Sequence, residues 1–121
     1  MATLTPTLTI TSSDATSDAL ALSITDSLTV TDPSVGVSKL TISTGTATVI
    51  LPKTAHTAHT YVYLKNTHDA ATIEFLNDDG EDYMTLSPGE FAFLPVKGST
   101  GLECVASSGS TVLEYAYWTK G

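Results

Sequence analysis

The sequence contains no arginine. Its only basic residues are five lysines, set against 13 aspartates and glutamates, for a formal net charge of −8. Binding to nucleic-acid phosphates depends on clustered Lys and Arg, and attraction to anionic lipids depends on polybasic segments. We therefore expect neither nucleic acid nor a membrane surface as a partner. An anionic substrate would also lack the bidentate clamp that Arg supplies.

Cysteine is also scarce, since Cys104 is the only one. A single cysteine excludes an internal disulfide and a zinc site built on cysteines. Cys104 alternates with Leu102 and Ala106, so we interpret it as a small buried hydrophobe rather than a nucleophile. The sequence also has no Gly-x-Ser-x-Gly, phosphate loop or dinucleotide fingerprint.

Segments that direct a chain to or through a membrane are missing from the pattern. The first ten residues, MATLTPTLTI, have no basic stretch followed by a continuous apolar one, so we do not expect them to act as a secretory signal. No apolar run approaches the ~18 residues of a membrane-spanning helix. We expect a soluble protein, made in a cytoplasm.

Hydroxyl groups take the place of charges. The chain has 22 threonines and 13 serines among 121 residues, whereas only 15% of residues are charged. Hydrophobic residues make up 41%, too many for a disordered chain. A hydroxyl-rich, β-branched composition favours strands over helices, so the sequence predicts an all-β protein.

Residues 1–31 form a Thr-rich region of their own. Leu4, Leu8 and Ile10 lie on even positions and threonines on odd ones, which is the period of a strand with one apolar face. Residues 19–31 alternate again, with Asp26 interrupting the apolar face, so we predict two short strands around a bend. The Ser/Asp-rich segment 12–18 is a predicted turn or link, and Asp32-Pro-Ser34 a further turn.

This region has no aromatic residue and too few large apolar ones to form a core. Pro6 cannot donate to a strand ladder, which favours an edge strand or an arm. We predict that residues 1–31 are an N-terminal arm or edge strands that borrow a surface from a partner. Leu4, Leu8 and Ile10 would face that partner.

Residues 37–121 hold every aromatic residue and predict the main domain. Short alternating segments recur here at the spacing of a sandwich or barrel, without a sustained helical period. We predict a jelly-roll-like β-sandwich. Its predicted strands cover residues 37–43, 46–51, 60–66, 71–77, 82–86, 90–95, 101–107 and 111–118.

The aromatic side chains leave two interpretations open. Tyr61 and Tyr63 share one strand face, as do Tyr115 and Tyr117. Faces that point inward are core, whereas faces that point outward would stack on sugars or form a subunit contact. On the last strand we predict that Leu113 and Tyr115 are core. Trp118 shares its face with Glu114, so we place it near the rim or at a subunit contact.

Three motifs could in principle carry chemistry. Asn77-Asp-Asp-Gly-Glu-Asp82 is rich in oxygen ligands, but Asp-Asp-Gly between two strands first predicts an exposed hairpin turn, with a weak cation site as the alternative. His56 and His59 would point to opposite faces of a strand, so we predict a surface loop rather than a metal pair.

Ser87-Pro-Gly-Glu90 invites comparison with cupins, yet no His-x-His is present. We predict a β-turn there, and a protein with no catalytic site, cofactor or metal.

Several segments carry a family resemblance. Tyr61-Val-Tyr-Leu-Lys-Asn66, Leu86-Ser-Pro-Gly-Glu-Phe-Ala-Phe-Leu-Pro95, the closing Leu113-Glu-Tyr-Ala-Tyr-Trp118 and the Thr-rich opening resemble small virion structural proteins of tailed bacteriophages. The resemblance implies a head decoration (cement) protein on the capsid surface, made in the host cytoplasm. It also implies a homotrimer that binds the major capsid protein. The alternative is a tail or fibre-tip component that binds a receptor or carbohydrate.

Overall fold

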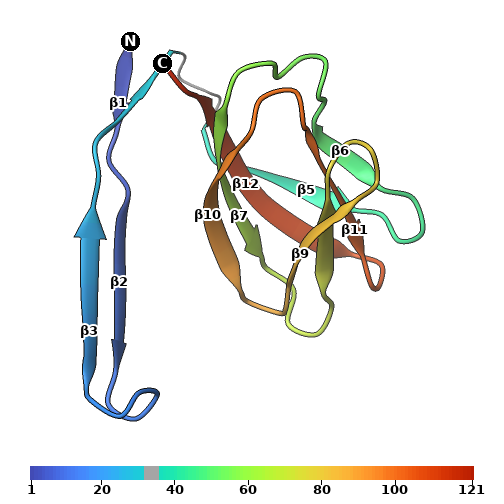
Figure 1. Ribbon diagram of the computed structural model, residues 1–121. Coiled ribbons are helices and arrows are strands. Elements are labelled where there is room, and N and C mark those ends of the chain that lie inside the picture. Colours follow the sequence, from blue (N-terminus) through green and yellow to red (C-terminus); the bar gives the residue numbers. More distant parts are fainter. Residues whose placement is uncertain (32–35) are drawn as a thin grey trace.

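The computed structural model describes residues 1–31 and 36–121. Within these residues the protein is all-β, with twelve antiparallel strands arranged as a two-stranded ribbon and a larger two-sheet body (Figure 1). The turn predicted at Asp32–Ser34 lies outside the described residues. The described residues hold no helix with the length and apolar character needed to cross a membrane.

The N-terminal ribbon is one continuous antiparallel pairing. It consists of β1 (Ala2–Leu4), β2 (Thr7–Ser12), β3 (Leu20–Thr25) and β4 (Leu28–Val30). β1 pairs with β4 and β2 with β3, in a single unbroken register. Between the two pairs, the Asp26 N–H donates to the Pro6 carbonyl at 3.1 Å, so the interruption predicted at Asp26 does not shift the register.

The predicted strands in this region are confirmed, and the structure adds a pairing between them that the sequence did not predict. The two alternating segments pair with each other around the loop at residues 13–19, rather than each lining the edge of another sheet. Pro6 is accommodated because it lies in the short gap between β1 and β2. Each ribbon strand therefore pairs along one edge only, and in the described residues beyond the base the outer edges and both faces of the ribbon have no partner.

The two-sheet body contains the eight remaining strands. They are β5 (Ser38–Ile42), β6 (Thr48–Leu51), β7 (Thr60–Asn66), β8 (Ile73–Leu76), β9 (Asp82–Leu86), β10 (Phe91–Val96), β11 (Leu102–Ala106) and β12 (Thr111–Thr119). Each was predicted, with ends correct to within two residues. One sheet has the order β10-β7-β12-β5 and the other the order β6-β11-β8-β9.

The strand pairings of the body are nested. β8 pairs with β9, β7 with β10, β6 with β11 and β5 with β12. Successive strands change sheet at every connection except that between β8 and β9. The two sheets bury their facing sides in a common core whose largest fully buried side chain is Phe75, and inward residues alternate with outward ones along β7 and β11.

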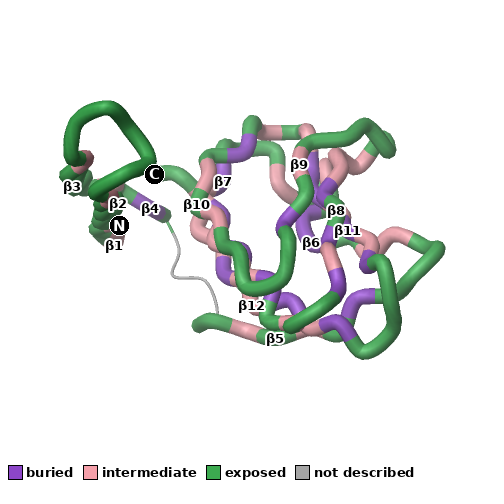
Figure 2. The backbone as a smooth tube through the Cα atoms, turned by 90° about the horizontal axis from the view of Figure 1, so that it is seen from below, coloured by how far each residue is buried: buried purple, intermediate pink, exposed green. Residues whose placement is uncertain are grey.

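The ribbon is joined to the body at its base. The Thr31 N–H donates to the Thr119 carbonyl at 2.9 Å, and the Gly121 N–H donates to the Thr29 carbonyl at 2.8 Å. Val30 forms a bridge with Lys120 and is buried. Beyond this joint the ribbon stands clear of the body in two perpendicular views (Figures 1 and 2).

Candidate interaction surface

The register of the ribbon sorts its side chains by chemistry. Leu8 lies opposite Ile24 and Ile10 opposite Leu22, so these four side chains share one face. Leu4 and Leu28 extend this apolar ribbon face toward the base. We define the apolar ribbon face by these six residues.

The opposite face of the ribbon is almost entirely hydroxylated. Threonine and serine side chains line it, and the hydroxyl groups of Thr7 and Thr25 hydrogen-bond across the strands at 3.0 Å. A hydroxylated face is compatible with water and with neutral hydrogen bonds to a partner. The two faces of the ribbon therefore differ completely in what they can contact.

The apolar ribbon face is exposed in the isolated chain. Ile24 is 57% exposed, and Leu8, Ile10 and Leu22 are each about 40% exposed. An isolated two-stranded hairpin is marginally stable in water, and contiguous exposed apolar residues mark interaction sites. The ribbon is therefore a candidate for contact with another molecule.

A second exposed apolar surface lies on the outer side of the β10-β7-β12 sheet. We define this aromatic patch as Tyr61, Phe91, Phe93 and Trp118, which share a face in the register of the three strands. Tyr61 and Phe93 stack with ring centroids 6.3 Å apart, and Phe93 and Trp118 are tilted at 6.5 Å. Phe91 is 65% exposed and Phe93 41%, so the patch is open to solvent.

The four residues predicted from the sequence to contact a partner fall on two surfaces. Leu8 and Ile10 are exposed on the apolar ribbon face, and Leu4 lies half-buried on the same face nearer the base. Trp118 is half-buried within the aromatic patch. The structure thus brings Leu4, Leu8 and Ile10 together and places Trp118 elsewhere.

Sequence reasoning missed several members of both surfaces. Leu22 and Ile24 join the apolar ribbon face because their strand pairs with β2, and Phe91 and Phe93 dominate the aromatic patch. The alternation of residues 19–25 was visible in the sequence, but not its partner. Phe91 and Phe93 alternate with Ala92 and Leu94, so both faces of this strand are apolar and no local signal marked which of them points outward.

The other aromatic residues divide between core and surface. Leu113 and Tyr115 pack in or against the core, as predicted, and Tyr117 packs there too. Tyr61 and Tyr63 take the outward alternative. Tyr63 donates its hydroxyl hydrogen to Glu114 Oε1 at 2.7 Å. Burial, this hydrogen bond and the negative charge of Glu114 raise the pKa of Tyr63 to about 12.

The acidic segment forms the predicted hairpin turn between β8 and β9, with one correction. Asp79 and Glu81 are exposed, but Asp78 is half-buried and its Oδ2 accepts a hydrogen bond from the Lys53 backbone at 3.0 Å. The side chain of Lys53 pairs with Asp79. Asp78 therefore holds the turn to the loop between β6 and β7. Sequence spacing alone did not indicate this contact.

The histidines serve as hydrogen-bond acceptors or packing partners in loops. His59 Nδ1 accepts from the Gly98 N–H at 2.8 Å, and the ring of His56 contacts Tyr117 edge-on at 5.2 Å. His68 Nδ1 accepts from the N–H groups of Ala70 and Ala71. Because this nitrogen accepts two hydrogen bonds, its 3.6 Å approach to Asp69 is not an ion pair.

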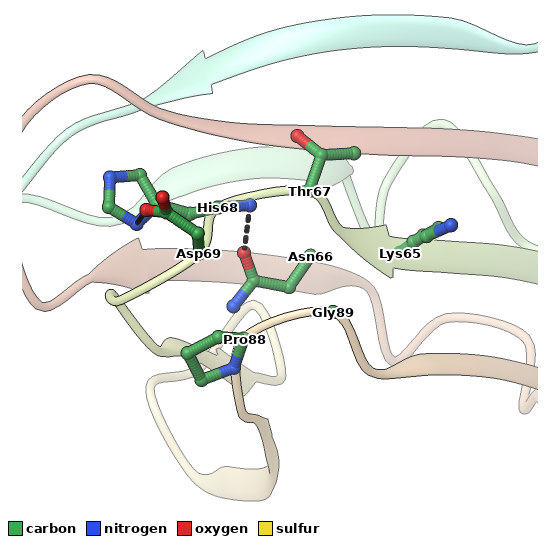
Figure 3. A pocket seen from close by; sticks show the side chains of 7 residues that line it. All are labelled: Lys65, Asn66, Thr67, His68, Asp69, Pro88 and Gly89. Carbon is green, nitrogen blue, oxygen red and sulfur yellow. Dashed lines mark hydrogen bonds and ion pairs between the residues drawn. The ribbon is translucent and has the colours of Figure 1, made fainter.

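A shallow depression of about 410 Å³ lies beside His68, between the start of the β7–β8 loop and Gly89 (Figure 3). Its floor is Asn66, which is fully buried. Asn66 Nδ2 donates to the carbonyls of Ala71 and Leu86, and its Oδ1 accepts from the His68 N–H at 3.0 Å. The polar groups of Asn66 therefore cross-link two loops and are not free for a ligand.

The remaining motifs are also structural. The Glu90 N–H donates to the Ser87 carbonyl, and Gly89 has a φ of 78°, so residues 87–90 form the predicted β-turn with Pro and Gly in its central positions. Cys104 is buried, and desolvation raises its pKa to about 12. In the part of the chain that the structure describes, no group of three or more His, Cys, Asp or Glu residues is placed to hold a metal ion.

Comparison with known proteins gives no relative to guide the function. No protein-family model matches the chain, and neither a curated protein nor a solved structure matches it. The function has to be inferred from the surfaces of the chain itself.

Proposed function

We propose that this protein is a non-enzymatic virion structural protein of a tailed bacteriophage, a head decoration protein that binds and stabilises the shell of the major capsid protein. The observation that carries the proposal is the projecting ribbon. Among the described residues its hydrogen bonds to the body lie at its base, and it offers an apolar face on one side and a hydroxylated face on the other. Such an element serves to contact other subunits.

We further infer that the body is a jelly-roll-like β-sandwich. Its nested pairings, β8–β9, β7–β10, β6–β11 and β5–β12, correspond to one long antiparallel hairpin rolled up into two sheets. Jelly rolls of eight strands are common in viral capsid proteins, but also in lectins and cupins. The strand order supports a structural role without requiring one.

The chemistry of the surface suits a cement protein. The hydroxyl groups on the hydroxylated face of the ribbon can make many neutral hydrogen bonds without the desolvation cost of buried charges. Several copies acting together would add these modest contacts by multivalency. The proposed unit is a homotrimer on the capsid surface, as the resemblance to phage proteins implies.

A role without catalysis agrees with the side chains that could have reacted. The Nδ1 atoms of His59 and His68 accept hydrogen bonds from backbone N–H groups. Cys104 is buried and has a raised pKa, so its thiolate is disfavoured. Asn66 uses its amide to hold loops together.

A second candidate function is supported by the aromatic patch. Tyr61, Phe93 and Trp118 form an exposed, partly stacked surface of the kind that can contact sugar rings. In that case the protein would be a tail or fibre-tip component that binds a receptor carbohydrate. Localisation in the particle separates this candidate from a head decoration protein.

The test is binding to shells. Purified protein is incubated with shells of the major capsid protein encoded in the same genome, and with shells of an unrelated lattice as a control. We expect saturable co-sedimentation with the first only, density on the outer surface in electron micrographs, and a higher melting temperature of the shell. Protein found only at the tail, or binding only to glycans, would overturn the proposal in favour of the second candidate.

A further inference from the structure

The apolar ribbon face needs a cover that its own body does not provide. Its middle residues, Leu8, Ile10, Leu22 and Ile24, remain 39–57% exposed in the folded chain. A two-stranded ribbon with such a face gains stability only when another surface packs on it.

The same chain carries a matching uncovered surface. The aromatic patch is apolar and open, with Phe91 the most exposed aromatic residue of the described chain at 65%. Aliphatic side chains on a flat ribbon and aromatic rings on the outer side of a sheet can pack face to face, as in sheet-on-sheet packing. Each of the two surfaces could therefore provide the apolar cover that the other lacks.

The charges around the two surfaces are complementary. Residues 1–31 contain Asp14, Asp18 and Asp26 and no lysine. Asp26 is the residue that interrupts the even, apolar positions of the ribbon, between Ile24 and Leu28.

Four of the five lysines belong to the strands of the patch sheet or directly follow them. Lys39 and Lys65 flank Glu114 in the register of β5, β12 and β7. Lys97 and Lys120 line a depression beside Tyr61. The carboxylates at this sheet are Glu114, which accepts from Tyr63, and Glu90, which accepts from the Ser87 N–H. The acidic ribbon and this lysine-rich sheet are therefore complementary in charge.

The joint at the base argues against the ribbon covering its own patch. Backbone hydrogen bonds of Thr29 and Thr31 to the end of β12, with buried Val30 between them, fix the direction in which the ribbon leaves the body. With these bonds in place, the ribbon stands clear of the aromatic patch of its own body (Figures 1 and 2). A second copy can reach the ribbon without disturbing them.

We propose that the apolar ribbon face of one copy packs on the aromatic patch of a second copy of this chain. The contact is head-to-tail, so it closes into a ring when the rotation between copies allows. This inference names the contact surfaces for the self-association that the proposed function includes, and on which it rests, but it is tested on the protein alone, without shells. Binding to shells and self-association can each fail without the other.

The first experiment measures mass in solution by analytical ultracentrifugation of the full chain without shells. We expect wild-type protein to be oligomeric at micromolar concentration. Ile24→Glu and Phe93→Glu, one on each surface, should each weaken association roughly 30-fold or more, the effect of losing a central contact residue. Circular dichroism checks that both variants remain folded.

Two matched variants serve as controls. Ser23→Glu places the same charge on the neighbouring residue, which faces the other side of the ribbon. Tyr83→Glu replaces an aromatic residue that is 42% exposed, compared with 41% for Phe93, but lies on the other sheet. Both should associate like wild type.

Cross-linking identifies the contact directly. Chains carrying Ile24→Cys and chains carrying Phe93→Cys are coexpressed and treated with a short bismaleimide, with Tyr83→Cys replacing Phe93→Cys as the control. Cys104 is buried and should not react in the native protein. We expect a cross-link between the two kinds of chain only in the first mixture.

Three results would overturn the proposal. They are a monomeric wild-type protein over the whole concentration range, an oligomer that survives Ile24→Glu or Phe93→Glu, and the absence of the expected cross-link in an oligomeric sample.

Discussion

The ribbon and the two-sheet body are built from strands of the same kind, in which apolar residues line at least one of the two faces. In the body the apolar side of each strand meets a second sheet, and residues such as Phe75 and Leu113 are completely buried. In the ribbon the apolar side meets solvent, and Ile24 remains more than half exposed. Alternation thus specifies a strand with two different faces, but it does not specify what covers the apolar one.

The difference has a thermodynamic meaning. The body contains its own core, so its free energy of unfolding belongs to the single chain. The ribbon has no core of its own, and its backbone pairing alone is marginal. The full stability of the ribbon should appear only when a partner covers its apolar face. This difference in stability between ribbon and body can be measured.

The largest effect is expected from the body core. Phe75→Ala should lower the free energy of unfolding by about 3–5 kcal/mol, because it removes a fully buried ring and leaves a cavity. Ile24→Ala should change it by less than about 0.5 kcal/mol in dilute protein, where the ribbon face is in water. Urea denaturation measures both. Similar losses for the two variants would show that the body already covers the ribbon.

The next largest effect is expected from Asn66, whose buried side-chain amide lies beneath the β7–β8 loop. Asn66→Ala should cost about 2–3 kcal/mol, because two buried carbonyls and the His68 N–H lose their partner. Asn77→Ala is the matched control, since Asn77 Oδ1 also bonds two backbone groups, accepting from the N–H groups of Asp79 and Glu81, but in a more exposed turn, and its loss should cost about 1 kcal/mol. Equal costs at the two sites, again from urea denaturation, would contradict the structural role of Asn66.

A smaller effect should appear at Tyr63 and depend on pH. Tyr63→Phe removes the hydrogen bond to Glu114 and should cost about 1 kcal/mol at neutral pH. The raised pKa of Tyr63, about 12, means that its neutral form is favoured in the folded state. This contribution is complete below pH 10 and is lost as the pH rises from about 10 to 12.

The measurement is the difference in free energy of unfolding between wild type and Tyr63→Phe along that pH range. We expect the difference to shrink as the pH rises. A difference that stays constant from pH 9 to pH 12 would show that Tyr63 titrates alike in the folded and unfolded chain.

The smallest effect on the body is expected from deleting the ribbon. Removal of residues 2–27 leaves Val30 and its bonds to the end of β12 in place. The melting temperature of the body should then change by no more than roughly 4–8 °C, the equivalent of about 1 kcal/mol for a domain of this size. Circular dichroism follows the transition. A truncated chain that does not fold would mean that these residues are ordinary strands of the body.

Local rules accounted for most of the strands and turns. Each strand of the body was visible as a short alternating segment, and Pro88-Gly89 indicated a turn that only a residue with positive φ completes easily. The burial of Cys104 and Leu113 followed from alternation with apolar neighbours. These features depend on a few consecutive residues, so a single sequence contains them.

The pairing of distant segments was decided by the tertiary structure. Strand alternation indicates that Leu8 and Ile10 share a face, but only the pairing of β2 with β3 adds Leu22 and Ile24 to it. In the same way, the pairing of β10, β7 and β12 joins Phe93, Tyr61 and Trp118 into one patch. The sequence by itself determined strands with an apolar and a polar side. Which strands lie next to each other, and which apolar sides stay uncovered, depend on contacts between residues far apart in the chain, and the local pattern does not contain them.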